Sequence, residues 1–168
     1  MLKLGKLTDY ATVLLAAMAA APERLYAAQE LSSRTSVAAP TVAKLMKQLQ
    51  QGGLVSSTRG SRGGYRLLKA PAQVTVADVI RALEGPIALT DCAVHGACAI
   101  EAGCGAKAPF RLINAAITQA LEAVTLADMA ASMAPTGRVA VEVKEFPLQF
   151  HPANSPLTGQ VNAHVRRR

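Results

Sequence analysis

The sequence is poor in aromatic residues: it contains no tryptophan, and aromatic side chains make up only 4% of its 168 residues. A core built on large rings is therefore excluded. The hydrophobic share is nevertheless 51%, and much of it is alanine, which favours closely packed helices. The length is sufficient for one compact domain with an appendage.

Long hydrophobic runs are also missing, since no apolar stretch reaches the length that spans a bilayer. The run ATVLLAAMAAA at 11–21 lies behind lysines and has the outline of a signal peptide. A patterned region continues directly after it, without a convincing cleavage site. The sequence therefore predicts a cytoplasmic protein with no membrane partner.

Acidic residues are few: 11 Asp and Glu stand against 18 Lys and Arg, which gives a net charge of +7. The excess is concentrated in residues 1–70, where ten basic residues face three acidic ones. This pattern indicates a polyanion-binding face, because Lys and Arg bind phosphates through counterion release; a merely soluble basic surface is the alternative. No Walker loop or nucleophile elbow is present, and the sequence predicts a protein that is not an enzyme.

Only three cysteines occur, and Cys92, Cys98 and Cys104 stand at equal intervals in one segment. An odd number argues against a closed disulfide framework, and clustered cysteines in a reducing cytosol more often bind metal or do redox chemistry. Six residues turn a helix by about 600° and span roughly 20 Å along a strand, so only a folded-back loop brings three sulfurs together. Thiolates select zinc, copper(I) or iron–sulfur clusters. The wide spacing favours a cluster over zinc, and three unligated cysteines are the remaining alternative.

A helix-turn-helix is predicted in the basic part of the chain. Thr8 is expected to cap a buried helix that Pro22 ends, and 27–35 reads as a short amphipathic segment with Leu31 inward. Ser36 is then expected to cap the second helix of the pair. That helix has one apolar face, formed by Val42, Leu45, Met46 and Leu49.

The second helix is the predicted recognition helix. Pro40 suits its first turn, and Gly52 supplies its stop. Side chains in the first turns of a recognition helix usually contact the base edges. Lys47, further along, is expected to contact a DNA phosphate. The DNA-binding residues expected here are Ala39, Pro40, Thr41, Lys44 and Lys47.

A basic hairpin follows, with strands over Leu54–Thr58 and Gly64–Leu68. Arg59, Ser61 and Arg62 lie at its tip, between glycines. A hairpin directly behind a helix-turn-helix is the layout of a winged helix, in which the hairpin reaches the minor groove and arginine is favoured there. A solvated surface hairpin is the alternative.

The second half is predicted to be helical at 75–86 and, beyond the cysteines, over 108–131, with a break near Thr125. The long helix has an apolar stripe that suggests a dimer, although intrachain packing is an alternative. From 135 the pattern dissolves into a polar, proline-rich tail that is expected to be mobile.

Three stretches of the chain, together with the evenly spaced cysteines, resemble the Rrf2 family of winged-helix transcription regulators. These stretches are KLTDYATVLLAAMA, LVSSTRGSRGGYRL and TVADVIRALEGPIALTDC. The resemblance covers about residues 1–130 and is strongest to the branch that regulates the SUF iron–sulfur assembly system. It implies a mainly α fold with a β-hairpin wing, and a homodimer. The implied domains are a winged helix-turn-helix at 1–86, a cluster-binding loop at 87–106, a dimerisation helix at 107–134 and a tail at 135–168.

The resemblance also implies the cofactor and its effect. Cys92, Cys98 and Cys104 would bind an iron–sulfur cluster, [2Fe–2S] in preference to [4Fe–4S], whose occupancy changes DNA binding. Some relatives add a histidine three residues after the third cysteine, where this chain has Lys107. Asp9 matches the position from which a nitric-oxide-sensing relative supplies a ligand across the dimer.

Two readings of the function remain. The first is a repressor that senses iron–sulfur status and controls cluster-assembly genes, and the second is a nitric oxide or redox-stress sensor of the same fold. A metal-binding module without a regulatory role is a more distant alternative. Besides Asp9, the fourth-ligand candidates are His95, Glu101 and a small exogenous group.

Overall fold

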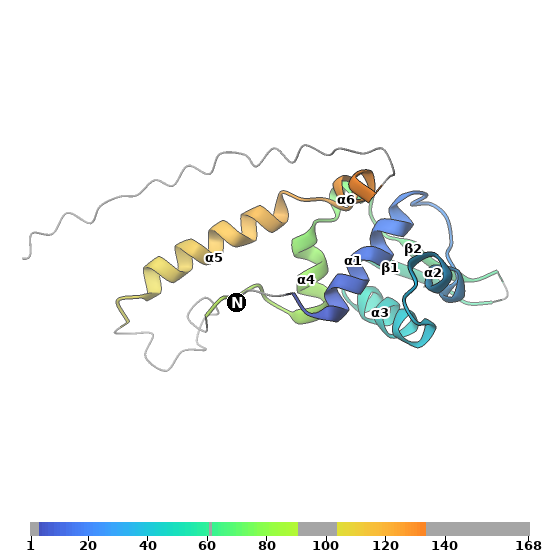
Figure 1. Ribbon diagram of the computed structural model, residues 1–168, viewed down its shortest axis with the longest axis horizontal. Helices are drawn as coiled ribbons and strands as arrows, with labels where there is room; N and C mark the ends of the chain where they lie inside the picture. The colour runs from blue at the N-terminus through green and yellow to red at the C-terminus, as the bar shows by residue number, and fades with distance from the viewer. Residues whose placement is uncertain (1–3, 61, 91–103, 134–168) are drawn as a thin grey trace, which may run out of the picture.

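The computed structural model describes residues 4–60, 62–90 and 104–133. Ser61, the cysteine segment at 91–103 and the tail from 134 lie outside them, and so do the predictions made there for Cys92, His95, Cys98 and Glu101. The described elements, in chain order, are α1 (Lys6–Ala19), α2 (Ala28–Thr35), α3 (Ala39–Gln51), β1 (Val55–Thr58), β2 (Gly64–Leu67), the 3-10 turn η1 (Pro71–Gln73), α4 (Val76–Glu84), α5 (Lys107–Glu122) and α6 (Leu126–Met133) (Figure 1).

The helices α1, α2 and α3 with the β1–β2 hairpin form a winged helix, which confirms the predicted fold class. The apolar face predicted for α3 is buried as expected, since Val42, Leu45, Met46 and Leu49 all have no exposed surface. Burial of side chains of this size stabilises the fold by about 1.5–3 kcal/mol each. The face of α3 that remains therefore points to solvent.

The two capping predictions in the helix-turn-helix are wrong. The cap of α1 is Gly5, and Thr8 lies inside the helix, where its hydroxyl donates to the Glu84 carboxylate. The cap of α3 is Ala38, because Ser36 ends α2 instead, in a left-handed conformation with φ 59°. Thr8 thus serves a tertiary contact, and Ser36 serves the end of the preceding helix.

The last helix of the described chain returns to the first. The break predicted near Thr125 is present: Thr125 and Asp128 exchange hydrogen bonds at the start of α6. The backbone of this turn pairs with the start of α4, since Leu126 N–H donates to Val74 O at 2.9 Å. Leu126 is buried in the same core as Leu14 and Leu15 of α1. Residues 126–133 therefore complete the winged-helix core rather than extend α5.

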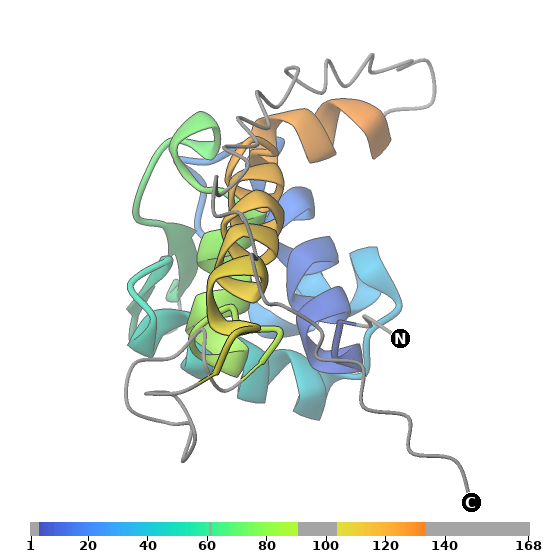
Figure 2. The same ribbon diagram turned by 90° about the vertical axis from the view of Figure 1, so that its left-hand side faces the viewer.

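Helix α5 lies against α4 and runs beyond it, away from the wing (Figures 1 and 2). An ion pair between Arg81 and Glu122 joins the two helices. None of the residues of α5 is buried, and Phe110, Leu112 and Ile113 are 39%, 45% and 46% exposed. No helix in the described part of the chain is long and apolar enough to cross a membrane.

Candidate nucleic-acid interface and cysteine site

The exposed side of α3 carries the residues that the sequence predicts for base recognition. Pro40 lies in the first turn, where a missing N–H removes no helical hydrogen bond. Thr41 follows it, half-buried, with its N–H donating to Ala38 O at 2.9 Å. Lys44 and Lys47 are exposed one and two turns further along. The start of this helix therefore offers small side chains for close approach and two cations behind them.

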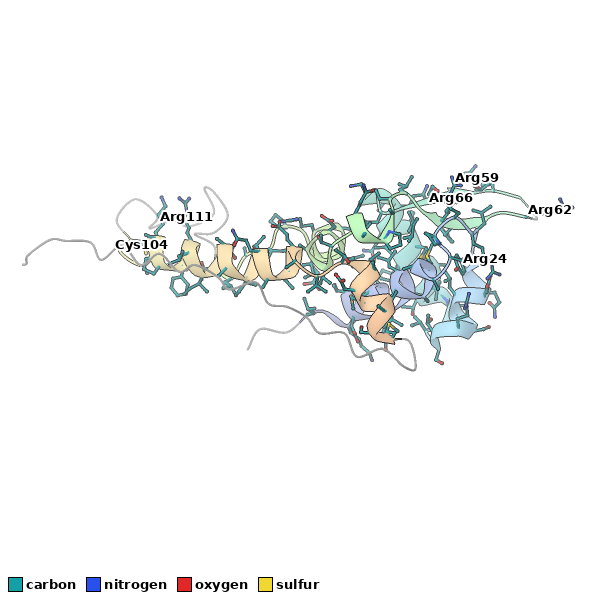
Figure 3. The ribbon with its side chains drawn as sticks, turned by 90° about the horizontal axis from the view of Figure 1, so that it is seen from above. Arg24, Arg59, Arg62, Arg66, Cys104 and Arg111 are labelled. Atoms are coloured by element: carbon teal, nitrogen blue, oxygen red, sulfur yellow. The ribbon has the colours of Figure 1, made fainter. Side chains whose placement is uncertain are left out.

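The wing carries its two arginines at the tip. Arg59 and Arg62 are both exposed, and Figure 3 shows Arg62 at the outer end of the hairpin. Gly60 has φ +116°, a conformation that side chains disfavour, and its carbonyl accepts from Gly63 N–H at 2.9 Å. The turn chemistry thus fixes a thin tip that holds guanidinium groups away from the body.

The wing is anchored to the chain in front of α2. Tyr26 and Tyr65 exchange both backbone hydrogen bonds, at 2.8 and 2.9 Å, so Tyr26 adds a bridge to the edge of β2. Gly64 permits this approach, because a Cβ at that position would lie 2.7 Å from the carbonyl oxygen of Tyr26. The orientation of the wing relative to α2 is therefore set by backbone contacts.

A cluster of charged residues at this anchor escaped the sequence prediction. Arg24 and Arg34 both contact the Glu30 carboxylate and both lie over the Tyr26 ring. The spacing of Glu30 and Arg34 is an ordinary helical pair, and nothing in the sequence joins it to the wing.

The described cysteine lies at the other end of the molecule. Cys104 is separated from the start of α5 at Lys107 by Gly105 and Ala106, and it lies at the end remote from the wing (Figure 3). It is partly exposed and has no disulfide to any residue that the structure describes, and its carbonyl accepts from Lys107 N–H at 3.3 Å. Among residues 4–60, 62–90 and 104–133, no group of three His, Cys, Asp or Glu side chains is close enough to hold a metal ion.

The segment that leads into the cysteines is fastened to α5. The Asn114 side chain donates to Ile87 O through Nδ2 and accepts from Leu89 N–H through Oδ1, both at 3.1 Å. One amide thus satisfies two backbone groups just before residue 91. Since Cys104 precedes the same helix, both described ends of the cysteine segment are attached to α5.

Asp9 lies exposed in the first turn of α1. The start of this helix is held by α4, because the Glu84 carboxylate accepts from Gly5 N–H at 2.9 Å and from the Thr8 hydroxyl. Within one chain α5 carries Cys104 away from α1, so the structure does not bring Asp9 and Cys104 together (Figures 1 and 3). The ligand role of Asp9 therefore stays a prediction.

Comparison with known proteins places the chain in a family. The Rrf2 model, described as an iron-dependent transcriptional regulator, matches residues 4–132. An Rrf2-like helix-turn-helix transcriptional regulator of Rhodobacter capsulatus is 30% identical over 117 residues, which cover 66% of this chain and 78% of the relative. Protein aau3 of Rhizobium meliloti is 30% identical over 130 residues, which cover 76% of this chain and 84% of the relative.

Two solved structures share the fold. The cysteine regulator CymR of B. subtilis superposes with a TM-score of 0.61 at 27% identity, covering 77% of this chain and 97% of CymR. IscR of T. potens superposes with a TM-score of 0.58 at 26% identity, covering 76% of this chain and 85% of IscR. The regulators of this family bind DNA and are not enzymes. With its winged helix, its basic tip and a family match over most of its length, the chain belongs to the Rrf2 family of transcription regulators.

Proposed function

We propose that the chain is a homodimeric repressor that senses iron–sulfur status and controls genes of cluster assembly. In this proposal residues 1–86 bind promoter DNA, 87–106 hold the cluster, 107–134 form the dimer and 135–168 are a basic tail. The helix α6 lies inside the range 107–134, but it packs on α1 in the winged-helix core.

The DNA-binding part of the proposal is supported by one electropositive end of the molecule. The start of α3 suits the major groove, and the wing tip suits the adjacent minor groove, where arginine is favoured. The residues proposed to contact DNA are Ala39, Pro40, Thr41, Lys44, Lys47, Arg59, Ser61 and Arg62.

The cluster part is carried by the attachment of both described ends of the cysteine segment to α5. Asn114 fixes the backbone at Ile87 and Leu89, and Cys104 presents a partly exposed thiol before the same helix. Cysteine sulfurs are the usual ligands of iron–sulfur clusters, and Cys92 and Cys98 would supply the others. The cofactor would be a [2Fe–2S] cluster in preference to [4Fe–4S]. Its occupancy would depend on the supply of iron and sulfide.

The fourth ligand is proposed to be Asp9 of a second subunit, with His95 as the alternative. The exposed position of Asp9 in the first turn of α1 supports this choice, because its carboxylate is accessible to another subunit. A carboxylate is a hard ligand for iron, so such a site would be labile, as a sensor requires.

The dimer is supported by the unpartnered apolar side of α5. Phe110, Ile113, Ile117 and Leu121 recur at helical spacing on one stripe, and none of them is buried within the chain. A stripe of this length is costly to leave in water, and a second α5 would cover it.

The proposal is tested by anaerobic purification followed by iron and sulfide analysis, absorption spectroscopy and footprinting with and without the cluster. We expect iron and sulfide in the wild type, and neither in Cys92→Ser, Cys98→Ser or Cys104→Ser, with all variants folded dimers. One equivalent of zinc without sulfide would refute the cluster.

The second candidate is a nitric oxide or redox-stress sensor of the same fold, and the exposed position of Asp9 favours it as much as the first. The two are separated by the signal that releases DNA. Loss of binding on iron chelation without nitric oxide supports the iron–sulfur sensor, whereas loss only on nitric oxide or oxidant supports the second.

A further inference from the structure

The geometry points to a second DNA-backbone contact beside the wing, made by Arg24, in the segment before α2, and Arg34, in the last turn of α2. We call these two side chains the arginine pair. The inference rests on the proposed DNA-binding function and adds phosphate-binding residues to those expected from α3 and the wing tip.

The arginine pair is held in place and yet exposed. Arg24 Nη2 lies 2.8 Å from Glu30 Oε1, and Arg34 Nη1 lies 3.5 Å from the same oxygen. The guanidinium carbons lie 4.9 and 5.6 Å from the centroid of the buried Tyr26 ring. The two arginine side chains are nevertheless 52% and 43% exposed. An exposed ion pair contributes little to stability, so this arrangement has little value as a structural device alone.

The chemistry of the pair suits phosphate. Each guanidinium has about five N–H donors in a rigid fork, and the two forks meet a single carboxylate oxygen. Two cations against the one Glu30 carboxylate leave a positive charge at this point. Because Glu30 and Tyr26 already restrict both side chains, binding a phosphate would cost less side-chain entropy than at a free arginine.

The position of the pair suits a DNA backbone. The Tyr26–Tyr65 backbone bridge fixes the pair relative to the wing. Figure 3 shows Arg24 at the same end of the molecule as Arg59, Arg62 and Arg66, with Cys104 at the other end. In a helix-turn-helix the first helix crosses the sugar–phosphate backbone while the second enters the groove. The helix α2 is that first helix, so phosphates are expected at its flank.

The test is a salt titration of DNA binding with Arg24→Gln and Arg34→Gln. The probe is a mixed-sequence duplex of about 30 base pairs, long enough for two half-sites, and a second probe is the operator enriched from a random duplex library. Each lost phosphate contact should flatten the slope of log K against log salt by about 0.9 and weaken binding about three- to tenfold at about 0.1 M salt. The loss should be equal on both probes, since phosphates carry no sequence.

The matched control is Arg81→Gln. Arg81 on α4 is 41% exposed and also contacts two carboxylates, those of Asp78 and Glu122. It should leave the salt slope unchanged. If Arg24→Gln lowers the unfolding temperature, Arg24→Lys is measured as well. It keeps the positive charge and should therefore keep the wild-type salt slope of DNA binding.

The outcomes are separable. A steep wild-type slope that neither Gln variant flattens, or that Arg81→Gln flattens equally, would overturn the arginine pair and leave DNA binding intact. A wild type that shows no salt-dependent binding to either duplex would instead overturn the proposed function.

Discussion

The helices α1 and α5 are the two longest in the described residues, and they lie in opposite environments. Seven of the 14 residues of α1 are buried, whereas none of the 16 residues of α5 is. The helix α1 is therefore stabilised by its own chain, through α2, α3, α4 and α6. The helix α5 keeps an apolar stripe exposed, and in the proposed dimer its stability would depend on association. The DNA-binding body and the cysteine end should accordingly respond differently to mutation.

The largest effect is expected from a cavity in α1. Leu15→Ala removes a fully buried side chain and should lower the free energy of unfolding by about 2–5 kcal/mol. Leu112→Ala on α5 removes a side chain that is 45% exposed and should cost less than about 0.5 kcal/mol. Urea unfolding measures both. Equal losses would contradict the contrast between the helices.

The association of α5 is tested next. Ile113→Glu places a charge on the exposed apolar stripe and should weaken the dimer by about a hundredfold, because the charge would be desolvated on pairing. Gln119→Glu adds the same charge to α5 outside the stripe and serves as the control. Analytical ultracentrifugation measures the dimer, and circular dichroism should show a folded body in both variants. A dimer that survives Ile113→Glu would place the interface elsewhere.

The wing end provides the third test. Arg59→Ala should weaken specific DNA binding by about 1–3 kcal/mol and relax the sequence preference, if the side chain reads a base edge or a narrow groove. Cluster content should not change, since Arg59 and Cys104 lie at opposite ends of the molecule (Figure 3). Fluorescence anisotropy with matched and mismatched duplexes measures the effect. An unchanged sequence preference would remove Arg59 from the recognition surface.

The attachment of the cysteine segment to α5 provides the fourth test. Asn114→Ala leaves Ile87 O and Leu89 N–H without their partner, at a cost of about 1 kcal/mol per bond. We expect a cluster that is lost several-fold faster in air, followed by visible absorption. Thr118→Ala, one turn further along α5, is the control. A cluster lifetime equal in the two variants would contradict a positioning role for Asn114.

The smallest effect concerns α4, which lies between the two regions. Burial alone would raise the pKa of Asp78, but hydrogen bonds from Thr75 and the cations Arg81 and Lys69 hold it below its usual 3.8. A lowered native pKa stabilises the fold above 3.8, and this contribution is lost as the pH falls through the native value. Asp78→Asn should cost about 0.5–1 kcal/mol at neutral pH and reduce the loss of stability on acidification. An unchanged acid unfolding curve would contradict this role.

Local patterns predicted most of the fold. The helical spacing of Val42, Leu45, Met46 and Leu49 identified the buried face of α3, because a period of 3.6 requires no knowledge of the partner. The break at Thr125 was also predicted, because Thr125 and Asp128 are a local capping pair.

Long-range contacts were not accessible to that reasoning. Thr8 was expected to cap a helix, but its hydroxyl binds Glu84, 76 positions away, and no local pattern encodes that choice. The arginine pair was missed for the same reason, because Tyr26 meets the wing only through the tertiary bridge to Tyr65. Of the predicted site, the structure describes the exposed residues of α3, the wing arginines, Asp9 and Cys104. The remaining ligands lie outside the described residues, and their roles stay predictions.

The return of α6 to α1 has a consequence for synthesis on the ribosome. Leu126 fills a place in the core that α1 leaves open, and the turn before it pairs with the chain in front of α4. Translation delivers α6 only after the whole cysteine segment and α5 have been made. A nascent chain that has just completed the wing therefore lacks part of its core. The order of the sequence thus delivers the last part of this core only after the cysteine segment has been translated.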